Sequence, residues 1–508
     1  MPIEKISTEV LVIGGGGAGM LAALEARKHG AEVLLLTKTV LGGGSCTALS
    51  FGAFRASRNA AEREDHFNQS LAAGRDLNDR ELLRILVEQA PDRVRDIEAL
   101  GVPLVREGPF LQVLGRAPFF GLVLTKALTA AVRAAGVGVL SKTLALDLLR
   151  EGDRCAGLLA YDLENQRLII VAARAVILAS GGSGALYSWH DNSPRNTGDG
   201  YALAARAGVR LRDMEFVQFY PLCLVEGGRY RMIIHETLGD IAPIRNARGE
   251  DLLVKYDIRE RPVALKARDA LSQAIFREMT LGSGGGSGVY LDLTGLDDHI
   301  WDEFSTLRAY KDVLLTTYPG RERPLEVGPV CHYFMGGAVV GPTGRTSLPG
   351  LWAAGEVAGG LHGANRLGGN ALSECAVFGP IAGADAATQL SRSPGPNVGR
   401  QAAEDWLVRL ERWRAEPGPS GAPVQELTRQ LARTMYDQAG IIRRRSGLLA
   451  AGEEVERLAA RLESGGQGSD PADILRSVEL FNLIAAARLV IAGALARPAS
   501  LGAHCRED

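Results

Sequence analysis

The segment that decides the fold is VLVIGGGGAG at residues 10–19. Residues 10–13 form a continuous apolar run, which is typical of a parallel strand buried on both faces. The spacing predicts an alanine-rich helix over residues 20–29 and a second buried strand over residues 31–36. Together these segments predict a βαβ unit with a right-handed crossover.

The turn between the first strand and the helix has the spacing Gly14-x-Gly16-x-x-Gly19 of a dinucleotide fingerprint. Such glycines allow a tight turn and a close backbone approach, and the helix N-terminus offers free N–H groups to a pyrophosphate. The acidic ribose ligand that usually follows the second strand is missing, because Thr37 and Lys38 stand there. The turn therefore predicts a dinucleotide but does not separate FAD from NAD.

Three later features favour FAD over NAD. They are the strand end Ser180-Gly181-Gly182, the turn Gly198-Asp199-Gly200 that opens a helix, and a strand over residues 351–354 that leads into Gly355-Glu356. In flavin folds built from two segments, a late strand ending in such an acid brings it to the ribityl chain. The alternative for Glu356 is a solvated acid in a turn.

Composition limits the classes of function. A chain of 508 residues is long enough for about two to four domains. Its formal net charge of −2 does not indicate binding to nucleic acid. The sequence contains no run of about 18 apolar residues, so we expect no direct membrane insertion. The six cysteines form no C-x-x-C pair, which argues against an internal zinc, iron–sulfur or other metal site. We expect reduced thiols, a cytoplasmic protein without a signal peptide, and electrons exchanged with another molecule.

The order of the predicted elements gives an α/β fold class. We expect a two-segment Rossmann-like FAD-binding domain (residues 1–220 and 326–390), an inserted α+β capping domain (residues 221–325) and a C-terminal helical domain (residues 399–508).

Three motifs carry a family resemblance: FVQFYP at residues 216–221, CHYFMGG at residues 331–337 and HGANRLGGN at residues 362–370. With them the chain resembles the succinate dehydrogenase/fumarate reductase flavoprotein family, which includes L-aspartate oxidase. The resemblance runs from about Glu9 to the end of the chain. It implies FAD as cofactor and hydride transfer between flavin N5 and the β-carbon of a fumarate-like acid.

The resemblance also implies roles for four residues. Arg268 would handle the proton, with Glu236 as its relay, while His332 and Arg366 would clamp a substrate carboxylate. A guanidinium and an imidazole can hold a carboxylate and polarise the adjacent double bond. The alternative for Arg268 is an ion pair with Asp269 at the helix end.

The cofactor contacts that we expect come from the glycine turn, the segment after the second strand, and the late FAD-binding motifs. They are Gly14, Gly16, Gly17, Ala18, Gly19, Thr37, Lys38, Ser45, Cys46, Thr47, Gly52, Gly182, Asp199, Glu356, Arg366, Asn370, Ala371 and Leu372.

The sequence departs from the family pattern at the flavin and at the far end of the substrate. Cys46 stands where membrane-complex members carry the histidine linked to FAD, so we expect non-covalent FAD; the alternative is a cysteinyl link. Tyr220 and His235 replace a histidine and a threonine of the second carboxylate's subsite. We expect both to contact substrate, together with His332 and Arg366. Exchanging these groups changes which polar groups can be paired there.

The leading hypothesis is a flavoprotein subunit that reduces an activated C=C bond beside a carboxylate, or oxidises the saturated acid. Fumarate/succinate is the best single substrate, with a larger enoate close behind, and an iron–sulfur or ferredoxin-like partner would carry the electrons. Contact with a membrane would run only through a partner subunit. Two alternatives stay open: an L-aspartate oxidase-like enzyme and an electron-transfer subunit with an altered substrate site. Two departures from the family pattern count against the oxidase, because L-aspartate oxidases normally keep both elements: the arginine- and glycine-rich stretch is replaced at residues 239–242, and a loop is shortened around residues 117–122.

Overall fold

The computed structural model describes residues 2–115, 120–284, 287–303, 305–392, 398–415 and 423–508. The glycine turn lies at one end of its central sheet, where β1 (Ile3–Ile13) pairs in parallel with β2 (Val33–Leu36) and β9 (Arg167–Leu178). The strand order is β6-β2-β1-β9-β8-β7, with β6 (Gly138–Leu140), β7 (Thr143–Glu151) and β8 (Arg154–Asp162). Helix α1 (Gly17–Lys28) begins three residues before its predicted start, because its first turn includes the last glycines of the motif.

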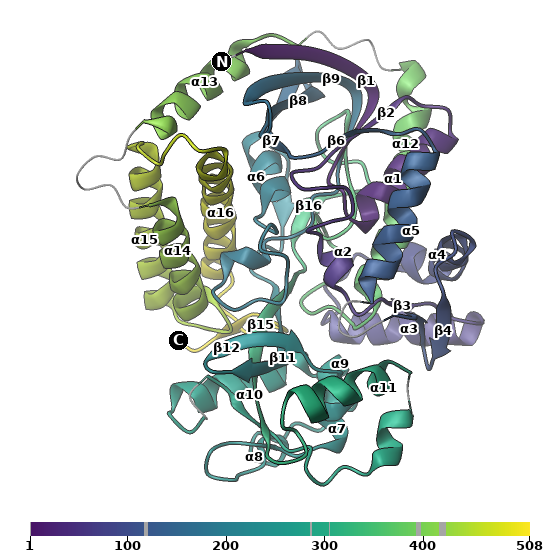
Figure 1. The fold of residues 1–508 in the computed structure, drawn as a ribbon, viewed down its shortest axis with the longest axis vertical. Helices are drawn as coiled ribbons and strands as arrows, with labels where there is room; N and C mark the ends of the chain where they lie inside the picture. The colour runs from purple at the N-terminus through teal and green to yellow at the C-terminus, as the bar shows by residue number, and fades with distance from the viewer. Residues whose placement is uncertain (1, 116–119, 285–286, 304, 393–397, 416–422) are drawn as a thin grey trace.

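A second segment of chain completes this sheet. β17 (Leu351–Ala353) pairs in parallel with the end of β9, so the predicted two-segment α/β fold is confirmed. α12 (Asn370–Thr388) then packs along α1, as Figure 1 shows. The other elements on this side of the molecule are α2 (Cys46–Leu49), β3 (Ala53–Arg55), α3 (Ala60–Ala73), α4 (Arg80–Ala99), β4 (Leu104–Glu107), β5 (Phe110–Val113) and α5 (Gly121–Ala134). Helix α6 (Asp199–Arg206) lies instead on the side of the C-terminal helices (Figure 1).

The cap occupies the lower end of the molecule in Figure 1. Its five-stranded sheet has the order β12-β11-β15-β14-β13, formed by β11 (Val217–Glu226), β12 (Arg229–Ile233), β13 (Ile244–Arg245), β14 (Val289–Leu291) and β15 (Leu325–Phe334). Its helices are α7 (Leu238–Ile241), α8 (Leu252–Lys255), α9 (Val263–Lys266), α10 (Arg268–Thr280) and α11 (Ser305–Asp312). The long strands β11 and β15 run across the predicted domain boundaries at residues 220 and 325, and so connect the cap to the rest of the chain.

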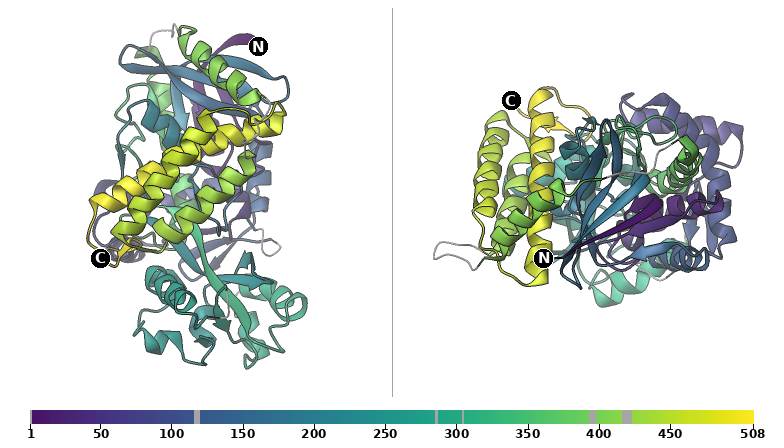
Figure 2. Two further views of the ribbon diagram at one scale, coloured as in Figure 1. Left: turned by 90° about the vertical axis from the view of Figure 1, so that its left-hand side faces the viewer. Right: turned by 90° about the horizontal axis from the view of Figure 1, so that it is seen from above.

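The C-terminal helices form a separate layer beside the sheet, which Figure 2 shows from two further directions. They are α13 (Gln401–Arg414), α14 (Val424–Ala439), α15 (Arg445–Glu463) and α16 (Pro471–Ala496). Within the described ranges, α16 alone is long and apolar enough to cross a membrane. The sequence analysis did not predict this, because polar residues interrupt the apolar run of α16. Of its most apolar window, 61% is buried, because α16 packs against α6, α14 and α15 as a core helix.

Candidate functional site

A cavity of about 1050 Å³ lies between the cap and the carboxyl ends of the parallel strands. The end of a parallel sheet is where α/β folds bind their ligands. Most of the residues predicted from the sequence line it: Gly14, Gly16, Gly17, Ala18, Thr37, Lys38, Ser45, Cys46, Thr47, Gly52, Asp199, His235, Glu236, Arg268, His332, Glu356, Arg366, Ala371 and Leu372.

Four predicted residues are absent from the cavity wall, and each lies one layer behind it. A Cβ on Gly19 would come within 1.9 Å of the Gly14 carbonyl oxygen, so Gly19 serves the packing of helix on strand. Gly182 leaves room for the Glu356 carboxylate, which a Cβ there would meet at 2.2 Å. The Asn370 side chain bonds His66 and Ser70, and the Tyr220 side chain is fully buried.

The turn itself needs glycine at its first position. Gly14 has φ +122°, and a Cβ there would lie 2.1 Å from the Ala179 carbonyl oxygen. The amide of Gly17 donates to Thr47 Oγ1 at 3.0 Å, which ties the turn to α2. Backbone at this turn therefore borders the cavity without side chains between them.

Polar atoms on the cavity wall fit a polar cofactor. Ser180 Oγ and Arg366 Nε line the cavity, are buried, and have no partner within the described part of the chain. Buried polar groups are normally satisfied, so such atoms suit contacts with a bound molecule. Glu356 accepts from the Phe334 amide at 3.0 Å, and burial raises its pKa to about 7. The alternative of a solvated turn acid is therefore wrong for Glu356.

Lys38 joins the cavity to the C-terminal helices. Its Nζ lies 2.8 Å from Asp199 and 3.1 Å from Glu479 of α16. Burial lowers the pKa of Lys38, but the two carboxylates outweigh burial and set the pKa above its ordinary value. Glu479 also pairs with Arg195 at 2.7 Å, and Asn482 donates to Asp199 at 3.1 Å. One end of the cavity is thus closed by a charged network that includes α16.

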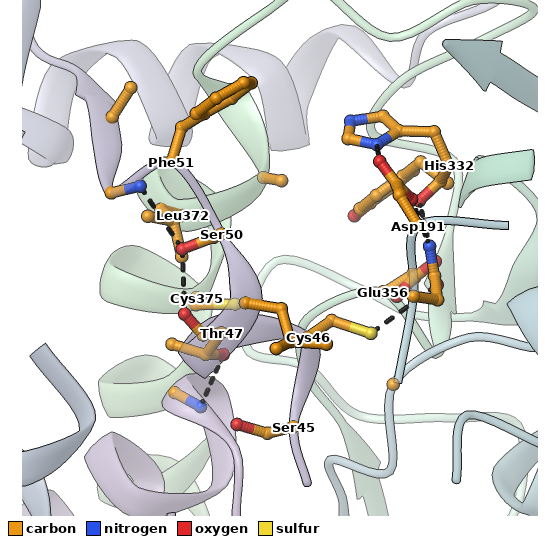
Figure 3. Close-up of a pocket in the computed structure, with 18 of the residues that line it drawn as sticks. Ser45, Cys46, Thr47, Ser50, Phe51, Asp191, His332, Glu356, Leu372 and Cys375 are labelled. Carbon is orange, nitrogen blue, oxygen red and sulfur yellow. Dashed lines mark hydrogen bonds and ion pairs between the residues drawn. The ribbon is translucent and has the colours of Figure 1, made fainter. Parts of the chain in front are cut away.

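Cys46 lies at the start of α2 (Figure 3), and its thiol contacts the side chains of two asparagines. Its Sγ lies 3.5 Å from Asn192 Oδ1 and accepts from Asn196 Nδ2 at 3.3 Å. Burial, with the nearby Glu356 carboxylate, raises the pKa of the thiol. The thiolate, which is the reactive form, is therefore disfavoured.

Three cationic or potentially cationic side chains share another part of the cavity wall: Arg268, Arg366 and His332. The Arg366 guanidinium stacks over Tyr333 at 4.4 Å, and burial together with the charge of Arg268 lowers its pKa to about 10. Arg268 donates from Nε to the Ala264 carbonyl at 2.6 Å and from a terminal nitrogen to Gln218 at 3.2 Å.

Asp269 pairs with Arg75 at 2.9 Å, so the alternative of an Arg268–Asp269 ion pair is wrong. Arg268 is instead fixed by the Ala264 carbonyl and by Gln218. The arginines and His332 form a positive site suited to a carboxylate.

His332 is held by an acid that sequence reasoning missed. Its Nδ1 lies 2.6 Å from Asp191 Oδ2, as Figure 3 shows. Burial raises the pKa of Asp191, but His332 outweighs burial and sets the pKa below its ordinary value, so the acid is ionised. The Nδ1 atom therefore carries the proton that bonds Asp191. Burial lowers the pKa of His332 below 6.5 even though Asp191 opposes this shift.

Other cavity-lining residues that the sequence did not single out include Phe51, Glu107, Asn192, Asn196 and Thr306. They reach the cavity from separate loops and elements, and no motif signals them. Within the described ranges, no group of three or more His, Cys, Asp or Glu side chains is arranged to hold a metal ion.

Comparison with known proteins agrees with this geometry. Residues 9–372 match the family described as FAD binding domain, and residues 428–508 match the one described as fumarate reductase flavoprotein C-term. The chain belongs to the succinate dehydrogenase/fumarate reductase flavoprotein family. Its cofactor is therefore FAD, and the protein is an FAD-dependent oxidoreductase.

The names of similar proteins in the family describe more than one enzyme activity. One subunit of the fumarate reductase (CoM/CoB) of Methanothermobacter marburgensis is 34% identical over 537 residues, covering 100% of this chain and 95% of that protein. L-aspartate oxidase of Streptomyces coelicolor is 33% identical over 547 residues, covering 100% and 90%.

Solved structures give the same assignment. Mycobacterium smegmatis Sdh1 in complex with UQ1 is 30% identical with a TM-score of 0.85, covering 99% of this chain and 89% of that one. E. coli quinol fumarate reductase is 27% identical with a TM-score of 0.89, covering 99% and 92%.

Proposed function

We propose that this flavoprotein reduces the C=C bond of an unsaturated carboxylic acid, with fumarate as the reference substrate, or oxidises the saturated acid. The observation that carries the proposal is the positive site of Arg268, Arg366 and His332 on the wall of the cavity that also contains the glycine turn. Charges fixed in advance around a carboxylate stabilise the negative charge that develops during reduction.

The three side chains divide two tasks between them: binding of the carboxylate and delivery of the proton. Arg366 and His332 hold the substrate carboxylate and draw electron density from the adjacent double bond. FAD, when bound, supplies or accepts the hydride. Arg268 delivers the proton to the α-carbon. Glu236, on the same cavity wall, then supplies a new proton to Arg268. A hydride at the β-carbon and a proton at the α-carbon convert the enoate into the saturated acid.

Electrons would reach the protein from an iron–sulfur or ferredoxin-like partner. Support comes from relatives whose names describe them as subunits, including the fumarate reductase flavoprotein subunit of Mycobacterium tuberculosis, which is 32% identical. We place the protein in the cytoplasm, with any contact to a membrane made through such a partner. The burial of α16 among the other C-terminal helices supports the absence of a membrane span in that helix.

The test is anaerobic reoxidation of the reduced, FAD-loaded protein by fumarate and by a series of other enoates. We expect at least one of them to restore the absorbance of oxidised flavin and to yield the saturated acid. Arg366→Met should abolish the reaction, whereas Arg308→Met on the exposed face of α11 should not change it. Failure of every enoate would overturn the proposal and leave an amino-acid oxidase or a flavin subunit that only transfers electrons.

A second candidate is oxidation of an amino acid such as L-aspartate, which the names of several relatives favour. Its measurement is hydrogen peroxide release from L-aspartate in air. A strict enoate reductase would release none with this substrate.

A further inference from the structure

The part of the cavity wall next to the positive site is formed by His235 and Phe51, with Tyr220 behind it. Tyr220 links the two parts, since its ring centre lies 5.0 Å from the Arg268 guanidinium and 5.5 Å from the His332 ring. This far wall would contact the end of the substrate that the positive site does not hold.

The phenol of Tyr220 is unable to bind substrate. Its hydroxyl donates to the Ile234 carbonyl at 2.7 Å, and its side chain is fully buried. Burial, together with the nearby Glu236 carboxylate, raises its pKa, so the phenol keeps its proton.

His235 is also engaged within the protein. The Thr306 hydroxyl donates to Glu107 Oε2 at 2.8 Å, so its oxygen can only accept from His235 Nε2, which lies 3.0 Å away. The other ring nitrogen, Nδ1, accepts from the Thr237 amide at 3.3 Å. In this pattern Nε2 carries the hydrogen, and its N–H bond points to Thr306 rather than to a ligand.

The surroundings of His235 disfavour a second negative charge. The ring of Phe51 lies 6.4 Å from the His235 ring and contacts Tyr310 at 5.8 Å. The carboxylates of Glu107 and Glu236 line the same cavity. A carboxylate placed here would lose water, meet like charges and receive no hydrogen bond from His235.

Most other cations on the cavity wall are engaged or exposed. Lys38 and Arg195 bond Glu479, and Arg231 pairs with Glu226. Arg55 donates to Gln69 and lies over the Phe110 ring, although its buried Nε has no partner in the described part of the chain. Lys266 is exposed to solvent, where an ion pair contributes little to binding.

We propose that the substrate is a monocarboxylic enoate whose far substituent is uncharged and packs against Phe51. This inference rests on the proposed function and narrows its substrate class. The positive site takes the single carboxylate, the β-carbon receives the hydride, and the α-carbon receives the proton.

The test compares crotonate, cinnamate and fumarate as oxidants of the anaerobically reduced, FAD-loaded protein. We expect kcat/KM for at least one monocarboxylate to exceed that for fumarate by about tenfold or more, since an unpaired buried charge disfavours the dicarboxylate. Equal or better turnover of fumarate would overturn the inference but leave the proposed function intact. Turnover of none of the three, nor of any other enoate, would overturn both.

A variant tests the role of Thr306 directly. Thr306→Val removes the acceptor that holds His235 Nε2–H, so the freed donor should raise the ratio of fumarate to crotonate kcat/KM by about tenfold. Thr280→Val on α10 removes an exposed hydroxyl that donates to the Phe276 carbonyl in the same helix, and should leave the ratio unchanged.

Phe51→Ala gives an independent readout, because it should lower kcat/KM for cinnamate by more than for fumarate. An unchanged ratio in Thr306→Val or an equal loss for both substrates in Phe51→Ala would contradict the assignment of this wall.

Discussion

Replacing Asp191 by asparagine should weaken carboxylate binding without removing any group that we expect to touch the substrate. Asp191 accepts the Nδ1 proton of His332 at 2.6 Å inside the protein. A neutral His332 therefore presents the lone pair of Nε2, and only the protonated ring can donate to a substrate carboxylate. Loss of the charged acceptor removes about 1.5–3 kcal/mol of stabilisation from protonated His332. This loss corresponds to carboxylate binding that is weaker by roughly 10- to 150-fold in Kd.

The same pair sets the pH dependence of binding. The pKa of His332 lies below 6.5 in the free protein, and a bound carboxylate raises it. The affinity for the carboxylate is therefore at its maximum below the pKa that His332 has in the free protein. It is lost as the pH rises through the pKa that His332 has in the complex. In Asp191→Asn the pKa of His332 in the free protein falls further, so the loss of carboxylate affinity begins at lower pH.

The assay is a titration of the oxidised protein with succinate or another saturated acid, followed by the flavin spectrum at several pH values. Asp298→Asn, at a surface pair with Arg321, is the matched control and should leave Kd unchanged. An Asp191→Asn protein with the Kd and the pH midpoint of the wild type would refute the role given to His332.

Three further predictions concern the cofactor and stability. Denaturation should release intact FAD, and Cys46→Ala should still bind it; flavin that stays with the denatured chain would contradict the non-covalent assignment. Glu356→Gln should weaken FAD binding about tenfold or more through loss of a charged acceptor, and wild-type affinity should fall as pH drops below about 7; equal Kd values from fluorescence titration would argue against contact with this carboxylate. Burial lowers the pKa values of His66 and His504 to about 4, so the unfolded chain binds more protons between pH 6.5 and 4 and the free energy of unfolding should decrease across that range. Chemical denaturation curves that are unchanged from pH 7 to 4 would rule this out.

Local patterns predicted the scaffold well. The apolar run at residues 10–13 and the glycine spacing fix a strand, a turn and a helix, because each depends on neighbouring residues alone. The same holds for Gly355-Glu356, where a short strand must end beside the sheet.

The sequence was less informative where contacts join distant segments. Asp191 lies 141 positions from His332, and Thr306 lies 199 positions from Glu107, so no spacing indicates either pair. Tyr220 was expected at the substrate, but its hydroxyl bonds a carbonyl 14 residues further along the chain. Such choices among hydrogen-bond partners depend on tertiary packing, which local patterns do not encode.

The network at Lys38 has a consequence for how the protein is made. Lys38 and Asp199 come early in the chain, yet their partners Glu479 and Asn482 lie on the last long helix. During synthesis, the N-terminal βαβ unit emerges from the ribosome long before these partners exist. A nascent chain that stops short of α16 leaves Lys38 without one of its two carboxylates. If Lys38 contacts FAD, as we predict from the sequence, full retention of the flavin requires a finished chain, and we expect cofactor loading to follow translation rather than accompany it.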